Sequence, residues 1–182
     1  MPRPQDTSTT PLEARDEWRT PPWIFGWCAR RFPFSIDLAA SAKNALLPLY
    51  FTREMDALSI DWSDFARSQG AAPVGWLNPP YSDITPWMQK AIEQAKRGFT
   101  TVVLVPQDNG EDRYGDFVHG VASEYRAITG RIAFLNAEGV PISGNTRGSA
   151  LVVYRGHDLG DTRYCHLMRD AMQQEMREAE AA

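Results

Sequence analysis

Residues 78–81, Asn-Pro-Pro-Tyr, are the segment of this chain whose residue types are best suited to chemistry. The two prolines fix two φ angles and remove two backbone donors, so the turn presents acceptors: the Asn78 side-chain oxygen and the carbonyls of Asn78 and Pro79. Tyr81 adds an aromatic face beside them. An amino group on a planar ring donates two hydrogen bonds to such acceptors while its ring stacks on the tyrosine. The segment therefore predicts a site for a planar group that carries NH2, in preference to an ordinary proline turn.

The elements on either side of this turn must hold it in place. Residues 74–77 are apolar and predict a buried strand that leads into the turn. Apolar residues recur at helical spacing over 84–95, with Ser82 or Asp83 as the N-cap and Gly98 as the stop. The turn is therefore expected between a strand and a helix.

A strongly β-forming run follows at 100–105 and is expected to end at Pro106. Strand, turn, helix and strand in this order indicate a parallel β–α–β unit. Ligands bind at the carboxyl ends of the strands in such sheets, which is where the Asn-Pro-Pro-Tyr turn would lie.

The first third of the chain predicts an arm, a helix and a strand. Residues 1–17 are polar and rich in Pro and Thr, which is typical of a mobile arm. A helix is expected next, with Thr20 as N-cap and Pro21 in its first turn. Residues 32–37 predict a short strand that ends in Asp37, and residues 39–47 a loop or short helix.

The second half predicts a short helix at 114–122, strands at 125–129 and 131–135 that meet at Gly130, and a loop over 136–148. A last strand is expected at 149–154. From Thr162 the pattern predicts a C-terminal helix with one apolar face: Tyr164, Leu167, Met168, Ala171, Met172 and Met176. We expect an arm at 1–17, a catalytic domain at 18–160, and a helix at 161–182 docked on that domain.

Composition limits the classes of protein to consider. The 182 residues are 43% hydrophobic and 23% charged, as expected of one globular domain. We expect neither a membrane span nor a signal peptide, because no apolar run approaches the roughly 20 residues that a span needs. Cys28 and Cys165 form no CxxC pair, which predicts a reduced cytoplasmic protein without a zinc site.

The formal net charge is −4, which counts against a nucleic acid as partner, since such proteins usually carry a basic surface. Much of the acid lies near the C-terminus, so a local basic cleft is still compatible with the sequence. Its candidate residues are Arg30, Arg31, Lys96, Arg97, Arg126, Arg131 and Arg147.

Over most of residues 18–154 the chain resembles the small phage-type DNA adenine-N6 methyltransferases (Dam-like), which depend on S-adenosylmethionine. The resemblance rests on the order and spacing of seven segments: WRTP at 18–21, IDLAAS at 36–41, DAL at 56–58 with Trp62, NPPYS at 78–82, VVLVP at 102–106, GRIAF at 130–134 and GSALVVY at 148–154. It implies an α/β fold of the Rossmann-like methyltransferase type, with a mostly parallel sheet flanked by helices.

The resemblance also implies roles for individual residues. Thr20 and Pro21 match the segment beside the methionine part of the cofactor. The first cofactor loop is matched by Asp37, Leu38, Ala39 and Ala40. The segment near the cofactor adenine is matched by Asp56, Ala57 and Leu58. The catalytic turn is matched by Asn78, Pro79, Pro80 and Tyr81. The chain lacks the Gly-x-Gly that many methyltransferases have after the first strand; small alanines stand there instead.

For an adenine substrate, Asn78 Oδ1 and the Pro79 carbonyl would accept the two amino protons and free the nitrogen lone pair. The base must leave the duplex to reach such a site, and stacking on Tyr81 would offset part of the cost. We expect double-stranded DNA as the partner, contacted by residues 107–113 and 136–147. The expected protein is a monomer or weak dimer, without metal, encoded by a phage or prophage in a bacterial host.

Two other classes use or mimic the same features. RNA adenine and protein glutamine methyltransferases also hold a planar NH2 with Asn-Pro-Pro-Tyr, and the segments around the turn favour DNA over them. A non-catalytic nucleic-acid binding module is the other alternative, and the intact turn counts against it.

Overall fold

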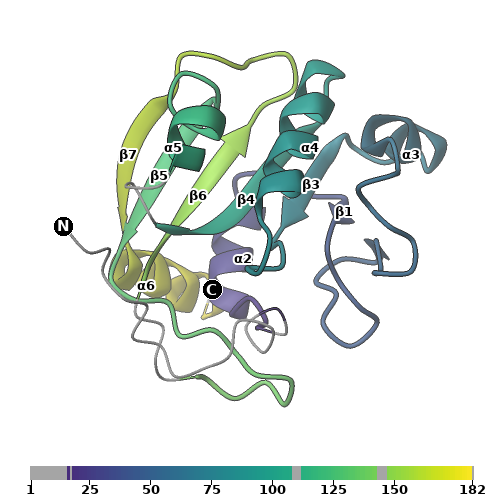
Figure 1. Ribbon diagram of the computed structural model, residues 1–182. Helices are drawn as coiled ribbons and strands as arrows, with labels where there is room; N and C mark the ends of the chain where they lie inside the picture. The colour runs from purple at the N-terminus through teal and green to yellow at the C-terminus, as the bar shows by residue number, and fades with distance from the viewer. Residues whose placement is uncertain (1–15, 17, 108–111, 143–146, 182) are drawn as a thin grey trace.

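The computed structural model describes Asp16 and residues 18–107, 112–142 and 147–181 (Figure 1). Its centre is a seven-stranded sheet in the order β2-β1-β3-β4-β6-β5-β7. Neighbouring strands are parallel except for the two pairs that include β6. The strands are β1 (Ile36–Asp37), β2 (Leu49–Tyr50), β3 (Val74–Leu77), β4 (Thr100–Gln107), β5 (Glu124–Thr129), β6 (Gly148–Tyr154) and β7 (Arg163–Met168).

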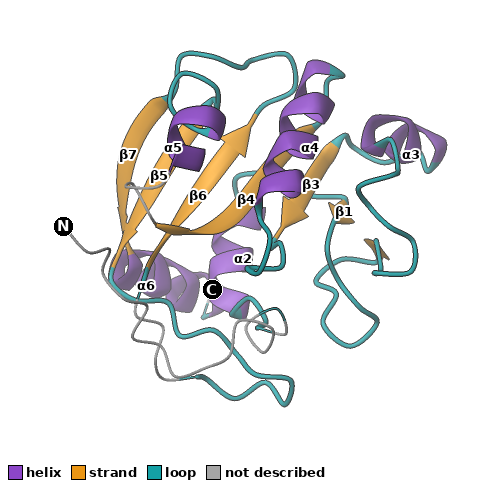
Figure 2. Ribbon diagram, in the orientation of Figure 1, coloured by secondary structure: helices purple, strands orange, loops and turns teal. Residues whose placement is uncertain are grey.

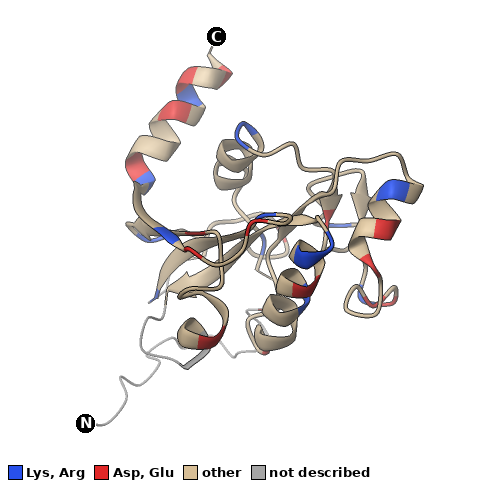
Figure 3. Cartoon of the chain, turned by 90° about the horizontal axis from the view of Figure 1, so that it is seen from above, with Lys and Arg blue, Asp and Glu red and all other residues tan. Residues whose placement is uncertain are grey.

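Helices cover both faces of this sheet (Figure 2). They are α2 (Pro22–Ala29), α3 (Trp62–Ser68), α4 (Thr85–Lys96), α5 (Asp112–Phe117) and α6 (Arg169–Glu180). Figure 3 shows α6 on the side of the sheet opposite α4, extending away from the strands. The α/β class and the mostly parallel sheet flanked by helices are thus confirmed.

The alternation of side chains along the central strands produces two cores. Val103 and Val105 of β4 pack with Met88 and Ala91 of α4 on one face. Val102 and Leu104 pack on the other face, in the cluster that contains α2. All of these side chains are buried, so the middle of the sheet is apolar on both sides, as expected for strands covered by helices.

The β–α–β unit around the Asn-Pro-Pro-Tyr turn forms as predicted: β3 spans 74–77 and runs parallel to β4, with α4 between them. The predicted cap is wrong, because α4 begins at Thr85 with Ile84 as N-cap and no side-chain cap hydrogen bond. Gly98, at φ +90°, follows the helix end as predicted.

Pro106 does not end its strand, because β4 continues to Gln107. Pro106 stays in register with Ser149 of β6, and its carbonyl accepts a hydrogen bond from the Tyr114 hydroxyl at 2.7 Å. On the other edge of β4, β3 has already ended at the pair Leu77–Val103, so no strand on that edge requires the missing proline donor.

The first helix begins later than expected. Pro22 is its first residue and Pro21 its N-cap, so the N-cap role predicted for Thr20 is wrong. A proline at the first helical position lacks only a donor that the helix would not use. Residues 1–15 and 17, in the predicted arm, lie outside the described residues.

The C-terminal region differs most from the prediction. Residues 163–168 are a strand, β7, parallel to β5, and the helix begins only at Arg169. Tyr164 and Met168 fit both a helical face and an alternating strand, so their spacing alone did not distinguish the two. The helix then packs on α2, where Trp27 Nε1 donates to Glu175 Oε2 at 2.8 Å and Met172 is buried.

Two shorter elements also differ. The helix predicted at 114–122 spans Asp112–Phe117, and residues 131–135 form no strand. Leu135 instead makes isolated bridges with Arg19 and Pro141. No helix among the described residues is long and apolar enough to cross a membrane.

Candidate active site

A cavity of about 480 Å³ lies at the carboxyl ends of β1, β2 and β3. Its walls come from the segments that follow these strands, together with Asp16 and the start of α4. The described residues that line it are Asp16, Leu38, Ala39, Ala40, Ser41, Asn44, Phe51, Thr52, Arg53, Asp56, Ala57, Leu58, Asn78, Pro80, Ser82, Asp83, Pro86 and Trp87. Three segments that are distant in sequence are therefore brought together, as the parallel topology predicts.

Asn78 is the first residue after β3 and lines this cavity. Its Nδ2 donates a hydrogen bond to the Trp18 carbonyl at 3.2 Å. A carbonyl can only accept, so this contact requires the side-chain nitrogen to face Trp18 and the oxygen to face away. Asn78 Oδ1 is buried and has no hydrogen-bond partner among the described residues. A buried acceptor without a partner is costly in a folded protein, which makes this atom a candidate for binding a ligand donor.

Tyr81 is not among the described residues that line the cavity. Its ring packs edge-on against Phe134, with centroids 5.9 Å apart and planes at 89°. The hydroxyl is buried with no hydrogen-bond partner among the described residues, and burial raises the pKa of Tyr81 well above its ordinary value. The ring, and not an ionised hydroxyl, is therefore what Tyr81 can offer to chemistry.

The two prolines of the turn differ in whether they line the cavity. Pro80 lines the cavity beside Asn78, whereas Pro79 is buried and does not. The structure thus brings Asn78 and Pro80 to the cavity and leaves Pro79 and Tyr81 outside its described walls.

Asp37 ends β1 but is buried and absent from the described cavity walls. Its Oδ2 accepts a hydrogen bond from the Leu46 amide at 3.0 Å, which holds the loop after β1. Burial raises the pKa of Asp37 to about 6, and hydrogen bonds from the Leu46 and Ala39 amides oppose that rise. The neighbouring Leu38 and Ala39 do line the cavity. The acid therefore shapes the loop, and Leu38 and Ala39 after it form part of the wall.

Asp56 and Ala57, in the segment after β2, also line the cavity. Asp56 has a left-handed backbone, at φ +50°, which is uncommon outside glycine. Ser59 stabilises this turn, because its amide and hydroxyl both donate to the Asp56 carbonyl, at 2.9 and 2.8 Å. The Ala57 carbonyl accepts from Trp62 Nε1 at 2.8 Å, which ties the wall to α3.

Thr20 and Pro21 are buried and are absent from the described cavity walls. The residue of this region that does line the cavity is Asp16, which the sequence reading did not select. Arg53 and Asp83 were likewise missed as site residues. No residue pattern distinguishes them from ordinary surface charges; only their proximity to the three strand ends in the fold identifies them.

The charges on the described walls are unequal. Asp16, Asp56 and Asp83 contribute three carboxylates, and Arg53 is the one described basic residue among the lining residues. Such a wall favours a ligand with net positive charge.

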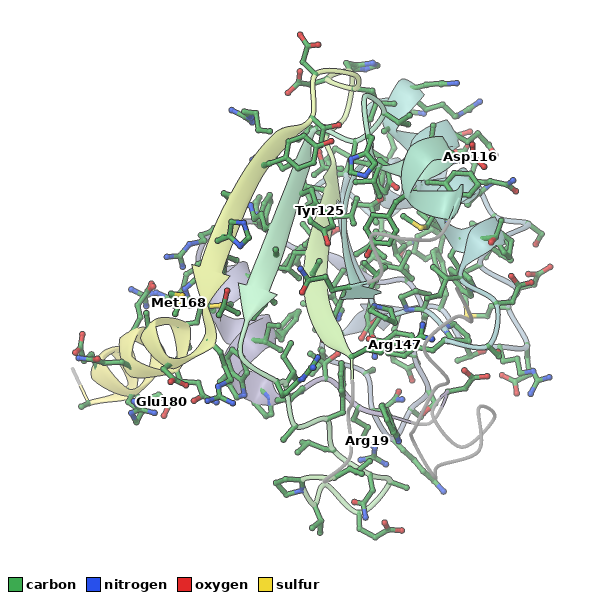
Figure 4. All side chains as sticks on the ribbon, turned by 60° about the vertical axis from the view of Figure 1, so that its left-hand side comes forward. Arg19, Asp116, Tyr125, Arg147, Met168 and Glu180 are labelled. Carbon is green, nitrogen blue, oxygen red and sulfur yellow. The ribbon has the colours of Figure 1, made fainter. Side chains whose placement is uncertain are left out.

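The loop between β5 and β6 lies beside the turn and links it to Trp18, near the N-terminus. Phe134, which contacts Tyr81, also stacks on Trp18 with centroids 5.6 Å apart. Asn136 Oδ1 accepts from the amides of Glu138 and Val140, which shapes the exposed tip of this loop. Figure 4 shows Arg19 and Arg147 at this same end of the molecule. Most of the predicted DNA-contacting segment 107–113, and residues 143–146 of the other, lie outside the described residues.

The known proteins that this chain resembles match it over most of its length. A family model described as DNA N-6-adenine-methyltransferase (Dam) matches residues 7–177. The chain is 27% identical over 175 residues to a DNA N-6-adenine-methyltransferase of Escherichia phage T1, covering 87% of this chain and 71% of the relative. It is 32% identical over 151 residues to a protein of the same name from Haemophilus phage HP1, covering 81% and 83%, respectively.

Proposed function

The chain belongs to the DNA N-6-adenine-methyltransferase (Dam) family, and on that premise we propose that it transfers a methyl group from S-adenosylmethionine to the amino group of an adenine flipped out of double-stranded DNA. The observation that carries the proposal is Asn78 Oδ1, a buried acceptor without a described partner. It belongs to a residue that follows a parallel strand and lines the cavity. The reaction would take place in the cytoplasm of a bacterial host, where phage relatives of this kind would act.

The cavity suits S-adenosylmethionine in size and in charge. Its volume of about 480 Å³ lies within the usual range of small-molecule sites, roughly 300–1,000 Å³. The cofactor carries a sulfonium and an ammonium against one carboxylate, and the excess of Asp over Arg on the walls matches that balance. The small side chains of Ala39 and Ala40 allow a close approach of the ligand to the backbone, in place of a glycine pair. Bound there, the cofactor supplies an electrophilic methyl group on sulfur.

Asn78 would prepare the nucleophile. The adenine amino lone pair is delocalised into the ring, and an acceptor at an amino proton favours a more tetrahedral nitrogen whose lone pair can attack. The Trp18 carbonyl already holds the amide nitrogen of Asn78, so Oδ1 is fixed in direction before substrate arrives. The Pro79 carbonyl is our second acceptor.

The substrate base would reach this acceptor only outside the helix, because a stacked and paired amino group is not accessible. The ring of Tyr81, three residues after Asn78 and packed on Phe134, provides an aromatic surface for that base. The loop with the exposed Val140 is bridged to Arg19 through Leu135, and together they are our candidate for contact with the DNA.

A methyl-transfer assay tests this function directly. The purified chain is incubated with tritiated S-adenosylmethionine and, separately, with unmethylated duplex DNA, RNA and protein. We expect incorporation into duplex DNA, as N6-methyladenine on nucleoside analysis. The matched control is the same DNA with its adenines already methylated at N6, which should accept no label. Label in RNA adenine or in protein glutamine instead would contradict the proposal, and long-read mapping of methylated DNA would give the target sequence.

A further inference from the structure

We propose that Asp16 is a positioning residue for the methyl transfer. It lies in the N-terminal segment, defined here as Asp16 and residues 18–20, which holds the turn Asn78–Ser82 at both of its ends. The inference rests on the proposed function, because it concerns how the acceptor of that reaction is aimed.

The far end of the turn is held by the Asp16 side chain. The Ser82 amide donates to Asp16 Oδ1 at 2.9 Å, and the Ser82 hydroxyl donates to Asp16 Oδ2 at 2.6 Å. Both oxygens of one carboxylate are therefore used, and hydrogen bonds to an ionised acceptor are among the stronger ones. This pair is not a helix cap, because α4 begins at Thr85 and Asp16 lies 66 residues earlier in the chain.

The near end of the turn is held by the backbone of the same segment. The Trp18 carbonyl accepts from Asn78 Nδ2 at 3.2 Å, two residues after Asp16. If the segment moves away, the Asn78 amide loses the contact that decides which of its two ends faces Trp18. Free rotation about the last bond of Asn78 would then exchange an acceptor for a donor at the reacting position.

The segment is anchored on its other side to the loop beside the turn. Arg19 and Leu135 exchange two backbone hydrogen bonds, at 2.8 and 3.0 Å, and Trp18 stacks on Phe134. Phe134 also packs edge-on against Tyr81, so these contacts fix residues 18 and 19 and the Tyr81 ring, but they do not reach Ser82. Asp16 provides the charged side-chain contact that connects the segment to Ser82, just beyond Tyr81.

This arrangement predicts an effect on the rate of the chemical step. A displacement of about 1 Å in a reacting group can cost on the order of 100-fold in rate, whereas substrate binding depends on many other contacts. Asp16 also lines the cavity, so direct contact with the cofactor is the competing explanation. Ser82 also lines the cavity, so the two explanations are separated by whether the effects of Asp16 and Ser82 on kcat are coupled and by whether cofactor affinity changes.

A double-mutant cycle separates them. We would compare Asp16→Ala, Ser82→Ala, the double variant and the conservative Ser82→Thr with wild type, at saturating DNA and cofactor. We expect Asp16→Ala to lower kcat by roughly 10- to 100-fold, and Ser82→Ala, which keeps the backbone donor to Asp16, to lower it less; in both, KM for DNA and calorimetric affinity for S-adenosylmethionine should stay within about 2-fold. The double variant should be no slower than the worse single one, and Ser82→Thr should retain most activity. Asp161→Ala, which removes an exposed carboxylate between β6 and β7, should match wild type.

A second measurement needs neither cofactor nor activity. In protein labelled with 15N-asparagine, the Asn78 side-chain amide signal should shift and exchange faster with solvent in Asp16→Ala, and remain unchanged in Asp161→Ala. An unchanged signal in Asp16→Ala would overturn the proposal. So would cofactor affinity that falls in Asp16→Ala alone, with effects on kcat that multiply in the double variant. If the wild type methylates nothing, the proposed function fails, whereas the amide signal still decides whether Asp16 holds the turn.

Discussion

The ring of Tyr81 meets the ring of Phe134 edge-on at 5.9 Å, and Phe134 stacks in turn on Trp18 at 5.6 Å. Three aromatic residues from the N-terminal segment, the Asn-Pro-Pro-Tyr turn and the loop before β6 thus form one contiguous group. Edge-on aromatic pairs contribute about 0.5–1.5 kcal/mol beyond the area that they bury. The position of Tyr81 therefore depends on the packing of its ring and not on its hydroxyl, which has no described partner.

Replacement of Tyr81 by Phe should leave both stability and methyl transfer intact. The substitution removes a buried hydroxyl without a described hydrogen bond, so we expect a melting temperature equal to or above that of wild type, and kcat within about 3-fold. Tyr81→Ala should lower stability by about 2–3 kcal/mol and reduce kcat much further, because the ring is lost. Thermal melts and single-turnover rates measure the two effects. A Phe variant as impaired as the Ala variant would show that the hydroxyl has a role that its surroundings do not indicate.

Asn78→Ala should abolish most methyl transfer while leaving the fold and the cofactor affinity in place. Loss of one preorganised hydrogen-bonding group typically costs about 100- to 1,000-fold in kcat. Asn78→Asp keeps acceptor oxygens of the same shape but cannot donate to the Trp18 carbonyl, so we expect it to be nearly as slow. Melting curves and calorimetry with S-adenosylmethionine serve as the controls. Turnover of the alanine variant at the wild-type rate would remove Asn78 from the mechanism.

Asp37 should make the stability of the protein depend on pH in the weakly acidic range. Its pKa is about 6 in the fold and 3.8 ordinarily, so the folded state binds the proton more tightly. The cost of the buried carboxylate is therefore fully present above pH 6 and disappears as the pH falls toward 4. Asp37→Asn should be more stable than wild type by up to about 3 kcal/mol at pH 7, and this advantage should shrink between pH 6 and pH 4. Urea titrations across that range measure it.

The same residue has a predicted role in cofactor binding, and the structure specifies how that role would work. Asp37 holds the Leu46 amide and thereby the loop whose Leu38 and Ala39 line the cavity. Asp37→Ala should therefore weaken S-adenosylmethionine binding, whereas Asp37→Asn, which keeps an acceptor for the amide, should weaken it less. Equal affinities for wild type and the alanine variant would contradict this role.

The parts of the fold that sequence predicted are those in which local pattern and burial agree. Residues 74–77 are apolar and are followed by two prolines, so both the strand and its end were determined locally. The helix after the turn has apolar residues at helical spacing that all face one core, and Gly98 marks its end. In these segments tertiary packing reinforces what the local sequence already favours.

The parts that sequence did not predict depend on contacts between distant segments. Ser82 looks like a helix cap, but its partner is Asp16, 66 residues away. Residues 163–168 have a spacing compatible with a helix, yet they pair with β5 along its whole length. No local pattern encodes either partner, so the N-terminal wall of the site and the last strand could be found only in the folded chain.

Strand β7, the last strand, is held in part by the side chain of Glu124. This contact leads to a prediction that concerns stability and not the candidate site. The nearly buried carboxylate of Glu124, at the start of β5, bonds Arg126, Arg155 and Arg163, at 2.5–3.0 Å. Burial raises the pKa of Glu124, but hydrogen bonds from Arg155 and Arg126 outweigh burial and hold it below its ordinary value of 4.5. Its stabilising effect is therefore present above pH 4.5 and is lost as the pH falls through the lowered value.

Glu124→Gln should leave three arginines around a neutral side chain, and removal of one partner from a buried ion pair typically costs about 3–5 kcal/mol. We expect a lower melting temperature and faster hydrogen exchange in β7, which Arg163 begins. Methyl transfer at a temperature where the variant is folded should be unchanged, because Glu124 is absent from the described cavity walls. Arg163→Ala is the matched control: its exposed side chain supplies the least buried of the three contacts, so it should cost about 1 kcal/mol or less. A variant Glu124→Gln as stable as wild type would show that β7 is held by its backbone pairing with β5 alone.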